Sequence, residues 1–123
     1  MKTSAQEIAK AQKALKDSGI VSANGDYKSV FGGYVSSFGA SLVQAGLLPT
    51  VIFYENKESE AKERYKVIVA LKQMLGINTE KLAAYLLANN KSDNQAFISQ
   101  VADAMVAVKL ALRMYNKKEE KDG

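Results

Sequence analysis

The sequence has no histidine, cysteine or tryptophan, and only one proline among its 123 residues. Without cysteine, the chain forms no disulfide framework and offers no thiolate as a nucleophile or metal ligand. Without histidine, it lacks the usual general base and the commonest metal ligand at neutral pH. Enzyme chemistry would have to use carboxylates, lysines, tyrosines and hydroxyls alone. These absences favour binding or scaffolding over catalysis.

Long apolar runs are also missing. No run approaches the roughly 18 residues that a membrane span needs, and residues 1–7 lack the apolar core of a signal peptide. We therefore expect no membrane contact and a cytoplasmic location. The chain carries 17 cations against 13 acids, a net charge of +4, and 15 of the cations are lysine. Lysine suits point-charge contact with phosphates better than bidentate reading of bases.

Apolar residues recur at three- and four-residue spacing through most of the chain, which predicts helices. The first helix spans about residues 5–17, and Ser4 opens it with a capping-box pattern. The last helix, about 94–115, is long and amphipathic. We predict an all-α fold, a compact single-domain bundle of about five or six helices over residues 1–116. Residues 117–123 are predicted to form a frayed, charged tail.

The second predicted helix, about 27–45 with Asp26 as its cap, has one apolar face and one face of small residues. Glycine inside a helix costs about 1 kcal/mol relative to alanine, so several on one face indicate close approach of another backbone. One interpretation is a subunit or nucleic-acid strand lying on this face; the other is a central helix packed on both sides within its own domain. The candidate close-contact residues are Gly32, Ser36, Gly39 and Ala40.

Gly46 and Pro49 mark a tight junction between two helices. The most apolar stretch of the chain follows, and its last part, residues 51–54, has the composition of a strand. The pattern shows no partner strand, so we predict a short buried helix there.

The acidic residues of the chain include one cluster, in which four glutamates alternate with cations. A metal or acid–base site needs carboxylates that converge in a partly dry pocket, so this alternation favours a solvated face. The sequence also has no phosphate-binding glycine motif, zinc spacing or nucleophile elbow. We predict no catalytic residue, cofactor or metal site. The clustered glutamates are Glu55, Glu58, Glu60 and Glu63.

Basic residues carry the remaining functional signal. The excess positive charge lies on the first and the later helices rather than in the tail. A lysine stripe is compatible with a solvated helix face or with contact along a phosphate backbone. The candidate RNA-binding residues, chosen by charge and face, are Lys10, Lys13, Lys16, Lys28, Lys109 and Arg113.

The segment from Tyr34 to Tyr54 resembles the small all-helical subunit of the type III-B CRISPR effector, the Cmr complex. That family carries a helix ending in Gln-x-Gly-Leu, matched by Gln44-Ala45-Gly46-Leu47, and then an apolar turn ending in Phe-Tyr, matched by Phe53-Tyr54. The chain departs from the family pattern at Ala40-Ser41, where a proline is common. Its last helix also lacks the family's tryptophan and paired basic residues.

The resemblance implies a non-catalytic subunit that stacks with copies of itself along the guide RNA–target RNA duplex. Its partners would be the other Cmr subunits, guide RNA and target RNA, with RNA cleavage performed by the neighbouring backbone subunit. Two alternatives remain open from the sequence. One is the equivalent small subunit of a type III-A effector, and the other is a helical protein–protein adaptor without nucleic-acid contact.

Overall fold

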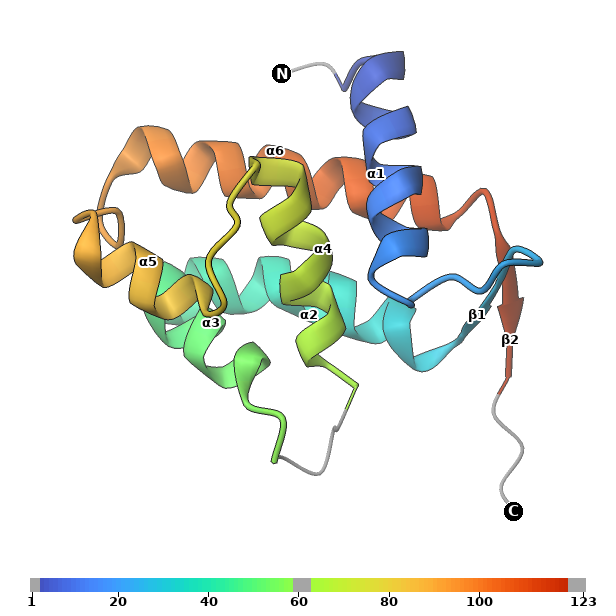
Figure 1. The fold of residues 1–123 in the computed structure, drawn as a ribbon, viewed down its shortest axis with the longest axis horizontal. Coiled ribbons are helices and arrows are strands. Elements are labelled where there is room, and N and C mark those ends of the chain that lie inside the picture. The colour runs from blue at the N-terminus through green and yellow to red at the C-terminus, as the bar shows by residue number, and fades with distance from the viewer. Residues whose placement is uncertain (1–2, 59–62, 120–123) are drawn as a thin grey trace.

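The computed structural model describes residues 3–58 and 63–119, which form a helical bundle with one small sheet (Figure 1). Within these residues there are six helices and two strands. The elements in chain order are α1 (Ala5–Asp17), β1 (Asp26–Lys28), α2 (Val30–Ala45), α3 (Leu47–Glu55), α4 (Tyr65–Leu75), α5 (Leu82–Ala88), α6 (Gln95–Leu112) and β2 (Asn116–Lys118). The prediction of a compact bundle of about five or six helices is confirmed, with the two-stranded sheet as an addition.

Helix α1 begins and ends where the sequence predicts. The Ser4 hydroxyl accepts a hydrogen bond from the Glu7 amide at 3.1 Å, which satisfies one of the free amides of the first turn. The helix ends at Asp17, and Gly19 turns the chain with φ of 84°. Ala11, Ala14 and Leu15 are buried against α4 and α6. This leaves the lysines of α1 on its outer surface.

The start of α2 differs from the prediction. Asp26 does not cap a helix; it is the first residue of β1, and α2 begins at Val30. The reason is a pairing that the local pattern does not show: β1 lies parallel to β2, with Lys28 opposite Lys118. The sheet also places Lys117 and Lys118 in a strand, two residues into the predicted tail, while residues 120–123 lie outside the described part.

The junction between α2 and α3 follows the prediction, but the predicted short buried helix is only partly buried, because Ile52 and Phe53 are 53% and 57% exposed. Gly46 has φ of 94° and separates the two helices, and residues 51–54 lie in α3 rather than in a strand. The Tyr54 hydroxyl donates to the Tyr34 carbonyl oxygen at 2.6 Å, and the Tyr54 ring meets Phe38 edge-on at 5.1 Å. Burial raises the pKa of Tyr54 to about 12. These contacts fix α3 against α2.

Helix α6 is the central helix of the bundle and packs against α1, α2 and α4. Figure 1 shows it running along the long axis, with α1 and α4 across it. Its 18 residues have a mean hydropathy of 1.3, so length and composition alone would also allow a membrane span. Its buried residues instead form part of the core, together with Phe31, Phe38, Leu15 and Leu71. The apolar character of α6 is that of a core helix.

Candidate nucleic-acid interface

The predicted RNA-binding residues of α1 lie on the surface. Lys10, Lys13 and Lys16 are all exposed. Lys13 forms an ion pair with Asp17 one turn later, at 2.9 Å, and the Asp17 carboxylate also accepts from Gln73 of α4 at 2.8 Å. Hydrogen bonds from Lys13 and then from Gln73 hold the pKa of Asp17 below its ordinary value. The α1 lysines thus form a solvent-facing surface whose central member already has an anionic partner.

The two predicted residues of α6 are exposed near its C-terminal end. Lys109 is the basic residue of the last turn, and Arg113 is the C-cap. The same end contacts α1, because the Lys16 ammonium lies 5.8 Å from the centre of the Tyr115 ring. The Gln12 amide also donates to the Met114 sulfur at 3.6 Å. The C-terminal ends of α1 and α6 therefore meet.

The sixth predicted residue, Lys28, lies in a cluster that the sequence did not reveal. Its ammonium is 2.7 Å from one oxygen of Glu63, and the Lys66 ammonium is 2.9 Å from the other. Hydrogen bonds from Lys28 and then from Lys66 lower the pKa of Glu63. The parallel register adds Lys118 directly opposite Lys28. We call Lys28, Lys66, Lys118 and Glu63 the sheet-corner cluster.

A pocket of about 300 Å³ opens at this cluster. All four residues of the sheet-corner cluster line it, together with the rings of Tyr27 and Phe31 and with Asp26. No local signal identifies Lys66 and Lys118 as partners of Lys28, since they are 38 and 90 positions away in the sequence. Only the packing of α4 and the strand pairing bring them together.

The small-residue face of α2 lies on the surface. Ser36, Gly39 and Ala40 are exposed, and Gly32 is half-buried. A Cβ added at Gly32 or Gly39 would meet no atom within 4 Å among the described residues. Nearby Val43 is 86% exposed, and α2 contains no charged residue. The interpretation that this face is packed within its own domain is therefore wrong.

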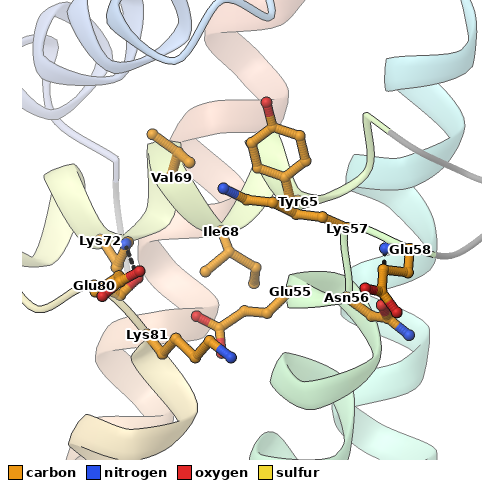
Figure 2. Close-up of a pocket in the computed structure, with 10 residues that line it drawn as sticks. All are labelled: Glu55, Asn56, Lys57, Glu58, Tyr65, Ile68, Val69, Lys72, Glu80 and Lys81. Carbon is orange, nitrogen blue, oxygen red and sulfur yellow. Dashed lines mark hydrogen bonds between the residues drawn. The ribbon is translucent and has the colours of Figure 1, made fainter.

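A second pocket, of about 470 Å³, lies between α3, α4 and the start of α5 (Figure 2). Its polar groups are used to join these elements. The Glu55 carboxylate accepts from the amides of Leu82 and Ala83, at 2.5 and 3.0 Å. The Lys72 ammonium donates to the carbonyl oxygens of Thr79 and Glu80, at 3.0 and 2.8 Å. We regard this pocket as a structural junction.

The predicted glutamate cluster is divided between different roles. Glu55 caps α5, Glu58 is exposed near the pocket of Figure 2, and Glu63 pairs with two lysines. Glu60 lies outside the described residues. Within the described residues, no group of three or more acidic side chains could hold a metal ion.

The fold and surfaces together define the class of the protein: a small helical protein with exposed lysines on α1 and an exposed, uncharged face on α2. Residues 3–116 match the family described as CRISPR-associated protein (Cas_Cmr5). The chain belongs to this family, the small subunit of type III-B CRISPR complexes, and the resemblance seen in the sequence is confirmed. No curated protein and no solved structure matched the chain.

Proposed function

We propose that this chain is a non-catalytic structural subunit of a Cmr ribonucleoprotein, stacking along the guide RNA–target RNA duplex in antiviral RNA interference in the cytoplasm. Membership of the family makes it a Cmr-associated subunit. The observation that carries the finer proposal is the exposure of the α1 lysines on a different helix from the exposed, uncharged face of α2. The first surface suits phosphates, and the second suits neighbouring protein, including further copies of this chain.

The sequence left two alternatives open, a type III-A subunit and a helical adaptor, and the observations bear on each of them differently. The family match favours the type III-B assembly over type III-A. A helical adaptor without nucleic-acid contact would use the α2 face, and its α1 lysines would then form only a solvated helix face. Duplex binding therefore separates the adaptor from the proposed function.

The test is binding of a labelled guide–target RNA duplex over a range of salt concentrations. Changing Lys10, Lys13 and Lys16 together to glutamine is expected to weaken binding about tenfold or more, and to lower the salt slope by roughly 0.9 for each phosphate that the variant no longer neutralises. A matched control changes Lys57, Lys81 and Lys91 to glutamine. This variant loses the same charge, but its three lysines lie near α3, α5 and the turn after α5 rather than on α1. Absence of duplex binding by the wild type would favour the adaptor, and equal binding by the wild type and the α1 variant would contradict the assignment of RNA contact to the α1 lysines.

The same preparations test the non-catalytic role. We expect no cleavage of RNA by the isolated chain. Metal-dependent cleavage that disappears on changing Glu58 or Glu63 to glutamine would contradict the proposal.

A further inference from the structure

The sheet-corner cluster is built around one carboxylate that holds two lysines from different elements. Glu63 precedes α4 and bridges Lys28 of β1 and Lys66 of α4 through separate oxygens. The Lys66 side chain is only 22% exposed and passes beside Gly19, where an added Cβ would lie 3.6 Å from the ammonium nitrogen. The lysines are therefore held in place, and Lys66 has little freedom to swing into solvent.

The geometry around Glu63 suits an oxygen anion. Carboxylate and phosphate oxygens both accept charged N–H donors at about 2.7–2.9 Å. Lys118 stands opposite Lys28 and lines the same pocket, so three lysines line it with Tyr27 and Phe31. Two carboxylates, Glu63 and Asp26, oppose them, and the charges of the lining residues sum to +1. Removing Glu63 from between the lysines would raise that sum to +2.

Partly exposed ion pairs contribute little to stability, because solvent screens them and their side chains lose freedom. Lys28 and Glu63 are 53% and 35% exposed at their side chains. An anion that competes with Glu63 for Lys28 therefore has only a weak ion pair to displace. An RNA backbone presents its phosphates in a row, and the exposed lysines of α1 supply further positive charge beyond the pocket.

We propose that the sheet-corner pocket binds a phosphate group of an RNA backbone, and that Glu63 is an internal counter-anion that holds Lys28 and Lys66 in position until RNA displaces it. This inference rests on the proposed RNA contact and adds a residue that opposes it. Glu63 is a positioning residue: it reduces affinity in the free chain while keeping the binding groups ordered. It also restricts the site to ligands that compete with a carboxylate.

The central experiment compares duplex RNA binding by the wild type, Glu63→Gln and a control, Asp93→Asn. Both variants gain one positive charge overall. Asp93 lies exposed in the turn between α5 and α6, at the opposite end of the molecule from the sheet (Figure 1). Glu63→Gln is expected to bind about fivefold more tightly, as follows from removing one like charge a few ångströms from a phosphate. Asp93→Asn is expected to change binding by less than about twofold.

A second variant does not depend on the ion pairs of Glu63. Lys118 is exposed, so Lys118→Gln is expected to leave the fold intact and to weaken binding about threefold. In the double variant Glu63→Gln, Lys118→Gln, most of the gain should disappear. Lys91→Gln, at the other end of the molecule, serves as the control with the same charge change. Circular dichroism confirms that each variant is folded.

The outcomes separate this inference from the proposed function. Failure of every variant to bind the duplex overturns the proposed function. Binding by the wild type with Glu63→Gln equal to Asp93→Asn, or Lys118→Gln equal to Lys91→Gln, overturns only the inference. Replacing chloride by inorganic phosphate at constant ionic strength is expected to change RNA binding less than about twofold, because one free phosphate lacks the other backbone contacts. Strong competition would assign the pocket to free phosphate and overturn its assignment to RNA.

Discussion

Alanine substitution of the α2 glycines should stabilise the isolated chain while weakening its assembly. Gly32 and Gly39 lie inside a helix, and a Cβ at either position meets nothing within 4 Å. Alanine is favoured over glycine in a helix interior by about 0.5–1 kcal/mol, so the double variant should gain about 1.5 kcal/mol. The entropy of unfolding for 123 residues is about 0.26 kcal/mol/K, so the midpoint of thermal unfolding should rise by about 6 °C.

Gly76 provides the matched control for this experiment. A Cβ there also meets nothing within 4 Å, but φ is 70°, in the left-handed region. Gly76→Ala should therefore lower the stability by about 1 kcal/mol, because only the backbone conformation differs. Thermal unfolding followed by circular dichroism gives the unfolding midpoint of the wild type, the double glycine variant and Gly76→Ala.

The second part of the assay is incorporation into a reconstituted Cmr complex. If a neighbouring backbone approaches α2 closely, the two added methyl groups should reduce incorporation of the double variant despite its greater stability. Full incorporation would refute the close-contact surface. A fall in the unfolding midpoint would instead refute the argument that the glycines face open space.

Two further predictions concern charged groups that join the helices. Glu55→Ala removes the acceptor for the first two amides of α5, a helix whose N-cap Lys81 makes no side-chain cap; we expect a loss of about 2 kcal/mol in chemical unfolding and a smaller loss for Glu55→Gln. An unchanged stability for Glu55→Ala, or an equal loss for exposed Glu58→Ala, would contradict this. Glu63 has a lowered pKa in the folded chain, so its ion pairs stabilise the fold above the unfolded pKa and cease to do so as the pH falls through the folded pKa. The wild type should exceed Glu63→Gln by about 1 kcal/mol or less at pH 7, a difference discounted for solvent screening, and the two should converge in acid; a difference that grows in acid would contradict the sign.

Local signals explain which parts of the fold the sequence could predict. The capping residue Ser4 and the turn at Gly46 act on neighbouring residues, so α1 and the α2–α3 junction follow from the sequence. The sheet could not be predicted, because strands of three residues are too short to show alternation. Its partners, Asp26 and Asn116, are 90 positions apart. The same long-range pairing explains why the local sequence around Asp26 predicts a helix cap where the structure has a strand.

In the candidate site, too, local features could be predicted from the sequence and long-range contacts could not. Lys28 could be chosen from its charge, but its neighbours Lys66 and Lys118 depend on packing and strand register. Glu63 fitted the pattern of a solvated charged face, and it is indeed partly exposed. Only the structure shows that its two oxygens face lysines from two elements. Periodicity also identified the small-residue face of α2 but could not show whether the domain covers it.

The open α2 face lowers the stability of the isolated chain, and Glu63, on the proposed function, lowers its affinity for RNA. The glycines of α2 lower helix stability without allowing any close contact within the described residues. Glu63 places a negative charge between two lysines that the further inference assigns to RNA binding. Stability alone would favour alanine in α2, and RNA affinity alone would favour a neutral residue at position 63. The proposed function would account for both, because such a subunit would leave room for neighbouring backbones and would avoid tight binding to RNA outside the complex.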